Sequence, residues 1–115
     1  MTLDDLYLTM PDHELELKNS LKKWILDWKV KDEGLDELVI LVDRWHGNVW
    51  FKNEQDSNSF YRNWIKFKEE FIDLVAGMTM NERLYVFGLF PVWDGADENG
   101  KSEIYKKLKA EKQST

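Results

Sequence analysis

The chain has 115 residues, of which 43% are hydrophobic, and this is enough for one small domain with a single core. Its formal charge of −6 at pH 7 disfavours a bare nucleic-acid backbone or an anionic membrane as partner and favours a basic protein. The absence of Cys excludes disulfides and thiolate metal sites. The N-terminal stretch lacks the basic and apolar segments of a secretory signal, and no apolar run is long enough for a membrane span. We therefore expect a cytoplasmic protein.

The first third of the chain predicts two helices. Residues 2–10 form an amphipathic turn or short helix that Pro11 interrupts. Asp12 is then expected to cap a longer helix that runs to about Lys31, with acidic side chains in its first turn and lysines in its last. The buried stripe of this helix is expected to consist of Leu17, Leu21, Trp24, Ile25 and Trp28.

The spacing of apolar residues over 35–46 predicts a further helix, with Gly47 as its stop. The run LVILV inside this stretch contains β-branched residues, so a buried strand is the alternative. The following residues are polar and typical of turns, apart from the short apolar run at 49–51. We expect a short extended segment near residues 48–52.

The strongest helical periodicity lies at residues 59–77, for which Ser57 or Ser59 is the expected cap. Large apolar side chains recur there every three or four residues: Phe60, Trp64, Phe67, Phe71, Leu74 and Val75. A stripe with this much aromatic surface has to be covered by the rest of the domain. The centre of the core is expected on this helix.

The last third predicts two more helices. Thr79 and Glu82 have the spacing of a capping box, and the helix that they open is expected to be closed by Pro91. A Gly- and Asp-rich loop is expected at 92–101, followed by a helix over about 102–112.

The sequence as a whole predicts an all-α fold, with residues 1–115 forming a single compact bundle of five or six helices. The candidate core comprises Leu17, Leu21, Trp24, Trp28, Leu38, Leu41, Val42, Phe60, Trp64, Phe67, Phe71, Leu84, Phe87 and Ile104.

Residues 95–102, GADENGKS, match the letters of a phosphate-binding loop. Asp97 and Glu98 would repel a triphosphate, and too little chain follows to build a nucleotide-binding sheet. An EF-hand register over the same stretch lacks the acids required at its first and last positions, which are Gly95 and Lys106. We interpret the stretch as a surface loop.

The chain offers few groups for catalysis. Its two histidines, His13 and His46, are far apart in sequence and belong to no metal-binding pair, and there is no Cys nucleophile. We expect no enzymatic activity, no cofactor and no metal.

Acidic residues are clustered rather than evenly spread, and two clusters adjoin tryptophans. Complementary charge speeds the encounter with a basic protein, while buried aromatic side chains supply affinity. Trp93 is the aromatic residue most expected to be exposed for this purpose, followed by Trp50 and Trp45. The candidate partner-binding residues are Asp32, Glu33, Asp36, Glu37, Asp43, Trp93, Asp94, Asp97 and Glu98.

The acidic clusters DEGLDE (32–37) and DGADE (94–98), the Trp-rich helices and the stretch SFYRNWIKFKEEF (59–71) are features of a known group. With its small size and lack of Cys, the chain resembles the acidic bacterial immunity proteins of contact-dependent growth inhibition and colicin systems. The resemblance implies a cytosolic, non-enzymatic protein that tightly binds a cognate toxin, often a nuclease. It would plug the toxin's active site or cover a neighbouring surface. We expect the chain itself to be a monomer or weak dimer.

Two other functions fit the same sequence. One is an acidic nucleic-acid mimic of phage origin that acts as an inhibitor or adaptor. The other is a small ligand-binding protein or enzyme whose site carries no recognisable motif.

Overall fold

The computed structural model describes residues 1–110, which form seven α-helices and no strand. The predicted all-α fold is therefore confirmed, with more helices than the five or six expected. The helices are α1 (Asp5–Leu8), α2 (Leu15–Val30), α3 (Leu35–Asn48), α4 (Glu54–Phe67), α5 (Met80–Val86), α6 (Phe90–Asp94) and α7 (Glu98–Lys107). Two 3₁₀ turns, Asp12–Glu14 and Val75–Gly77, and one π-helical turn, Lys68–Ile72, complete the regular structure.

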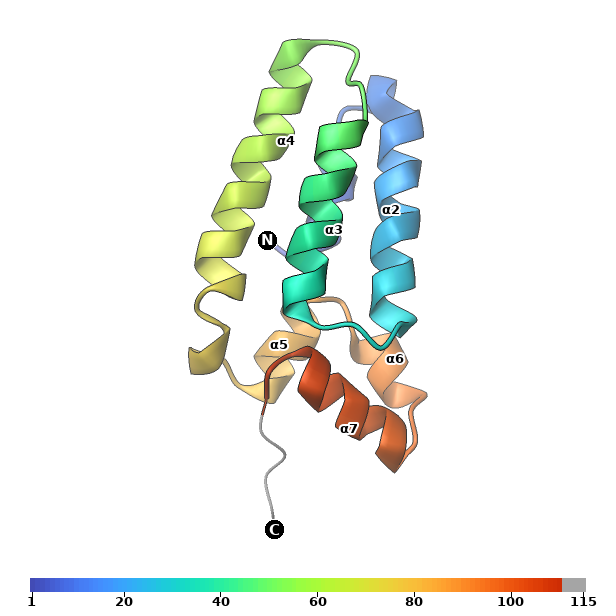
Figure 1. The fold of residues 1–115 in the computed structure, drawn as a ribbon, viewed down its shortest axis with the longest axis vertical. Coiled ribbons are helices and arrows are strands. Elements are labelled where there is room, and N and C mark those ends of the chain that lie inside the picture. Colours follow the sequence, from blue (N-terminus) through green and yellow to red (C-terminus); the bar gives the residue numbers. More distant parts are fainter. Residues whose placement is uncertain (111–115) are drawn as a thin grey trace.

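The three long helices α2, α3 and α4 stand side by side, and the short helices α5, α6 and α7 gather at one end of them (Figure 1). The helix α1 packs against α2 and α4, behind α3 in this view. Within residues 1–110, no helix has the length and apolar character needed to cross a lipid bilayer.

The helix predicted at 35–46 is confirmed, and the strand alternative is wrong. Gly47 does not stop α3, because the helix continues to Asn48. The backbone is extended at Val49, but residues 48–52 form no strand with any part of the chain that the structure describes. The expected extended segment is therefore only a connection between two helices.

The central helix begins earlier than predicted, because its cap is Asn53 and neither Ser57 nor Ser59. The Asn53 side chain accepts a hydrogen bond from the backbone N–H of Asp56 at 2.8 Å. The helix widens into the π-helical turn after α4, and this changes the phase of the residues that follow. Leu74, predicted on the apolar face, is consequently 63% exposed.

The helix predicted after Thr79 is confirmed at its start and ends sooner than expected. The Thr79 hydroxyl accepts from the backbone N–H of Glu82 at 3.1 Å. The helix α5 stops at Val86, and Gly88 then adopts a left-handed φ of +65°. Pro91 lies in the first turn of α6 instead of closing a helix, since a proline needs no hydrogen-bond donor there.

The loop expected at 92–101 is wrong, because it contains the end of α6 and the start of α7. Asp97 caps α7 by accepting from the backbone N–H of Gly100 at 2.8 Å, so the helix begins at Glu98 and not near residue 102 as predicted. The helix ends at Lys107, and the predicted end at Lys112 lies outside the described residues.

The predicted core is buried or partly buried except at Trp24, which is 38% exposed. Phe67, at its centre, has no exposed surface, and its ring centroid lies 5.2 Å from that of Phe71 and 5.7 Å from that of Phe87. The aromatic residues of α4 thus connect the long helices to the group of short ones.

Replacing Phe67 with Ala should lower the free energy of unfolding by about 3–5 kcal/mol, because it leaves a large cavity in this packed region. The control is Tyr85→Ala, where the side chain is 65% exposed and the loss should stay below about 1 kcal/mol. Urea denaturation measures both. Similar losses for the two variants would show that the core lies elsewhere.

Glycine substitutions should act in opposite directions at two positions. A Cβ at Gly88 would combine a left-handed φ with a clash against the Asp4 carboxylate and an approach of 2.7 Å to Lys29 Nζ. Gly88→Ala should therefore destabilise the fold by roughly 1–3 kcal/mol. A Cβ at Gly47 meets no atom within 4 Å, so Gly47→Ala should stabilise the fold by up to about 1 kcal/mol. Thermal unfolding of both variants tests this contrast.

Candidate functional site

The turn between α2 and α3 is built by hydrogen bonds from its two flanking helices. The helix α2 ends where Lys31 becomes extended, and Gly34 precedes α3. The Glu37 carboxylate reaches back and accepts from the backbone N–H of Gly34 at 2.9 Å. The indole N–H of Trp28 donates to the carbonyl oxygen of Gly34 at 2.8 Å. The turn is therefore held from both sides.

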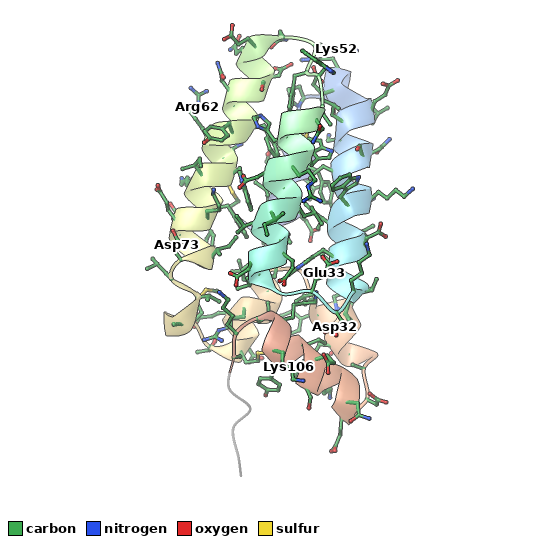
Figure 2. All side chains as sticks on the ribbon, viewed as in Figure 1. Asp32, Glu33, Lys52, Arg62, Asp73 and Lys106 are labelled. Carbon is green, nitrogen blue, oxygen red and sulfur yellow. The ribbon has the colours of Figure 1, made fainter. Side chains whose placement is uncertain are left out.

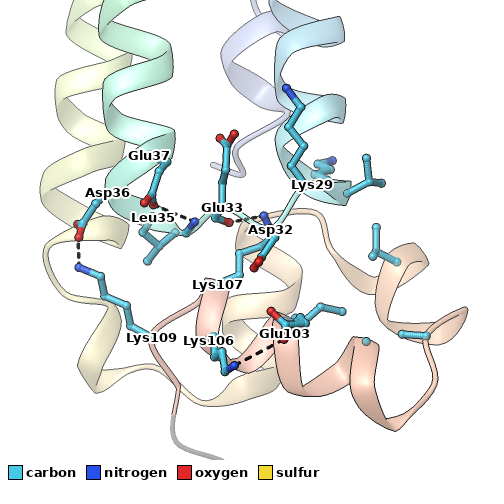
Figure 3. Close-up of a pocket in the computed structure, with 17 residues that line it drawn as sticks. Lys29, Asp32, Glu33, Leu35, Asp36, Glu37, Glu103, Lys106, Lys107 and Lys109 are labelled. Carbon is cyan, nitrogen blue, oxygen red and sulfur yellow. Dashed lines mark hydrogen bonds and ion pairs between the residues drawn. The ribbon is translucent and has the colours of Figure 1, made fainter.

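Lys107, from α7, closes this turn from below in Figure 3. Its ammonium donates to the carbonyl oxygens of Trp28 and Glu33, both at 2.5 Å, and lies 4.0 Å from the centroid of the Trp28 ring. The residue is only 6% exposed. Burial lowers the pKa of Lys107 to about 8, against the opposing effect of the carboxylates of Glu33, Asp32 and Glu37.

A cavity of about 520 Å³, here named the turn cavity, lies between this turn and α7. Its charged lining consists of five lysines and five carboxylates: Lys29, Lys31, Lys106, Lys107, Lys109, Asp32, Glu33, Asp36, Glu37 and Glu103. Lys109 Nζ lies 2.9 Å from Asp36 Oδ1, and Lys106 Nζ lies 3.5 Å from Glu103 Oε1 (Figure 3). The lysines at the end of α7 and just after it therefore offset part of the negative charge around the turn.

A second hollow, here named the α2–α3 groove, has a volume of about 430 Å³ and runs between the two helices. Its lining is Trp24, Asp27, Lys31, Glu33, Glu37, Ile40, Leu41 and Arg44. It shares Lys31, Glu33 and Glu37 with the turn cavity, so the two hollows adjoin at the turn. Trp24 and Ile40 are 38% and 55% exposed, which leaves an apolar surface bordered by three carboxylates and by the basic side chains of Lys31 and Arg44.

The structure brings four of the predicted partner-binding residues together in the turn cavity: Asp32, Glu33, Asp36 and Glu37. Figure 2 shows Asp32 and Glu33 near Lys106, at the end of the molecule where the short helices gather. Asp43 lies apart from them, because its carboxylate accepts from the indole N–H of Trp64 at 2.7 Å.

The second predicted cluster follows α6. Val92, Ala96 and Gly100 line the turn cavity, but Asp94, Asp97 and Glu98 do not. The two acidic clusters thus belong to the same end of the molecule, and they present different surfaces.

The three suspected tryptophans differ in exposure. Trp93 is half-buried, with its ring edge against Tyr105 and the ammonium of Lys101 at 5.1 Å from the ring centroid. Trp45 is buried, whereas Trp50 is 93% exposed. Trp93 is therefore not the free aromatic surface that the sequence suggested.

Sequence reasoning missed Trp24 as a surface residue. Its neighbour Ile40 is also exposed, whereas Leu41 is partly buried against the core, as predicted. The buried face of α2 is centred on Ile25 and includes Lys29, so Trp24 falls at its edge. The sequence gives no signal of this edge, because a lysine four residues after Ile25 is ordinarily expected on the solvent side.

The stretch 95–102 does not have the structure of a phosphate-binding loop. Asp97 is a helix cap, and residues from Glu98 onward are helical. No strand precedes them in the described part of the chain. A separate group of potential metal donors, formed by His13, Glu14 and Asp56, does not belong to the lining of either hollow.

Comparison with protein-family models, curated proteins and solved structures finds no match to this chain. The α2–α3 groove and the turn cavity are therefore the features of the molecule that bear on its function.

The pKa of Lys107 predicts a stability change at alkaline pH. Between its folded value of about 8 and its ordinary value of 10.5, the unfolded chain holds a proton that the folded chain has released. Stability should thus rise with pH, and wild type should gain about 2 kcal/mol over Lys107→Met between pH 7 and pH 10.

The control is Lys106→Met, since the Lys106 side chain is 76% exposed and burial does not act on it. Its unfolding free energy should follow that of wild type across the same pH range. A constant difference between wild type and Lys107→Met would show that Lys107 is not buried as described.

Proposed function

We propose that the chain is a non-enzymatic inhibitor that binds and neutralises a basic protein, such as a cognate toxin, through the α2–α3 groove. The observation that carries this proposal is the exposed Trp24 in a concave surface bordered by three carboxylates and by Lys31 and Arg44.

The groove has the chemistry of a protein-binding surface. A tryptophan that becomes buried in a complex contributes strongly to affinity, and surrounding polar groups exclude water from it. Ile40 and Leu41 extend the apolar area beside Trp24, and α2 and α3 are long helices that hold these side chains in place before a partner arrives. Little ordering is then needed on binding.

The partner class follows from charge. The net charge of −6 favours a basic partner, and the carboxylates at the groove speed its approach. The lysines that line the turn cavity offset its carboxylates, so the surface of this cavity does not resemble the uniformly negative phosphates of a nucleic acid. Binding through the apolar groove is therefore better supported than nucleic-acid mimicry.

Trp50 is the competing aromatic anchor, because it is more exposed than Trp24. It lies in the connection between α3 and α4, at the opposite end of the long helices from the turn, and it lines neither the groove nor the turn cavity. A single aromatic side chain outside a concave surface is a weaker anchor than one inside it.

The test is co-expression of the chain with the protein encoded next to it in its native host, followed by a binding measurement on the purified pair. Wild type should rescue growth if the neighbour is toxic. Trp24→Gln should raise the dissociation constant by about 30-fold or more, the effect of a binding hot spot. Trp50→Gln is the matched control and should leave it within about threefold.

Charge-reversal variants distinguish long-range electrostatic attraction of the partner from direct contacts in the complex. Glu33→Lys should slow association and reduce its salt dependence, whereas Glu69→Lys, an exposed residue of the π-helical turn, should change both little. Loss of binding in Trp50→Gln with normal binding in Trp24→Gln would show that the interface lies at the end of the long helices that carries the α3–α4 connection. No binding or rescue by the wild-type chain would contradict the proposed function.

A further inference from the structure

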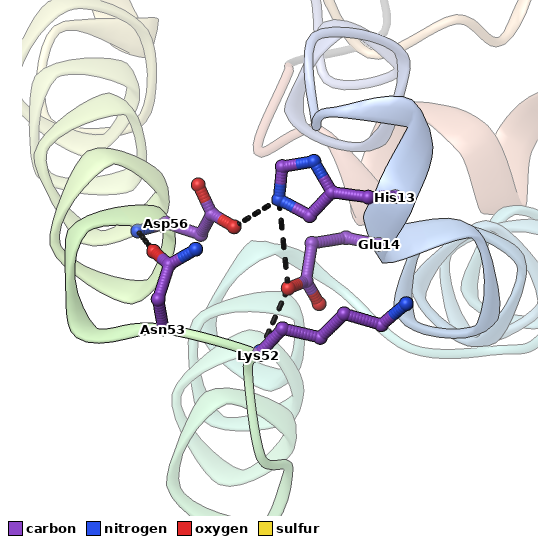
Figure 4. Close-up of polar contacts among 5 residues, drawn as sticks. All are labelled: His13, Glu14, Lys52, Asn53 and Asp56. Atoms are coloured by element: carbon purple, nitrogen blue, oxygen red, sulfur yellow. Dashed lines mark hydrogen bonds and ion pairs between the residues drawn. The ribbon is translucent and has the colours of Figure 1, made fainter.

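Three side chains that suit a metal ion meet at the end of the bundle opposite the turn cavity (Figure 4). His13 and Glu14 come from the 3₁₀ turn before α2, and Asp56 comes from the first turn of α4. One ligand atom from each residue lies within 4.8 Å of the other two. His13 Nε2 is 2.5 Å from Asp56 Oδ2 and 4.0 Å from Glu14 Oε1.

Glu14 is a buried carboxylate with little to balance its charge. Its side chain is 1% exposed, and the basic side chain nearest to it among its ion pairs in the described residues is the imidazole of His13, with 4.0 Å between Nε2 and Glu14 Oε1. Its one recorded hydrogen bond is accepted from the backbone N–H of Lys52 at 2.7 Å. A buried carboxylate in this state is costly unless a cation approaches it more closely.

The two carboxylate residues are held in place, while the histidine leaves an entry path. The backbone N–H of Lys52 orients the Glu14 carboxylate, and the N–H of Asp56 is bonded to the Asn53 side chain (Figure 4). The Lys52 bond is made to the Glu14 carboxylate itself, as metal ligands require in their outer shell, and the Asn53 bond fixes the Asp56 backbone at the start of α4. The His13 side chain is 51% exposed, so an ion can enter from solvent and keep water ligands.

We propose that His13, Glu14 and Asp56 bind a divalent transition-metal ion, with zinc as the best fit. One imidazole nitrogen and two carboxylate oxygens form a zinc-type ligand set, and water would complete the coordination. Tetrahedral bonds of about 2.0–2.2 Å place ligand atoms about 3.3 Å apart. The separations of 2.5 and 4.0 Å would each change by about 0.8 Å or less to accept the ion.

The ion would connect two segments that are 43 residues apart in sequence and fix the start of α2 to the start of α4. Without it, the same side chains form a direct pair between His13 and Asp56. The two states predict different responses to added zinc, because only the first gains stability from it.

The experiment titrates the tag-free full chain with ZnCl₂ by calorimetry and by thermal unfolding, with MgCl₂ as the comparison ion. Wild type should bind one zinc per chain and gain at least about 5 °C in Tm when zinc is in large excess over the dissociation constant. MgCl₂ should give no comparable shift, because magnesium prefers a set of oxygen ligands.

The variants His13→Gln and Asp56→Asn should each weaken zinc binding by more than about tenfold. The matched control is His46→Gln. His46 Nε2 is 3.2 Å from the Ser57 hydroxyl, its ring stacks with those of Phe60 and Tyr61, and it is not a member of the donor group. Zinc binding should survive in this variant.

The proposal is overturned if wild type binds no zinc, or if zinc binds equally well to wild type and His13→Gln. It is also overturned if His46→Gln removes binding while His13→Gln does not. Since His13 is half-exposed, its replacement should leave the chain folded, and the Tm of each variant without zinc verifies this.

Discussion

The arrangement of the candidate site depends on one buried ammonium group. Lys107 satisfies the carbonyl oxygens of Trp28 and Glu33 and lies over the Trp28 ring, so a side chain near the end of α7 fixes the turn between α2 and α3. The turn cavity and the α2–α3 groove meet at this turn, and both depend on its position. A lysine is suited to this place because its ammonium can donate to several carbonyl oxygens while its chain packs against apolar surface.

The same device recurs where the short helices join the long ones. Arg83 is buried and donates to the carbonyl oxygens of Met78, Ala76 and Leu108 at 3.1–3.4 Å. Lys29, also buried, forms an ion pair with Asp4 at 2.8 Å. Short helices bury little apolar area and leave many terminal carbonyls unpaired, so buried cations are an efficient way to satisfy them. These cations make the lower end of the bundle one connected structure.

The sequence was sufficient to predict the fold class, because a long amphipathic repeat, such as the one through α4, indicates a helix with one buried face whatever its local contacts are. It failed where a local contact decides the outcome: Asn53 and Asp97 cap helices that the periodicity placed elsewhere. It found the acidic residues of the turn and Asp43, yet two of these carboxylates are structural, since Glu37 bonds to the backbone and Asp43 bonds to an indole. Trp24 could not be identified as a surface residue, because a repeat pattern does not show where the edge of a buried face lies.

The most direct test of this account is an NMR measurement on the Lys107 side chain in the free protein. With its ammonium 4.0 Å from the Trp28 ring centroid, the Lys107 methylene protons should be shifted upfield of those of the other lysines and should show nuclear Overhauser contacts to the Trp28 indole. Ordinary lysine shifts with no contact to Trp28 would contradict the account, because α7 would then not fix the turn and the two hollows beside it.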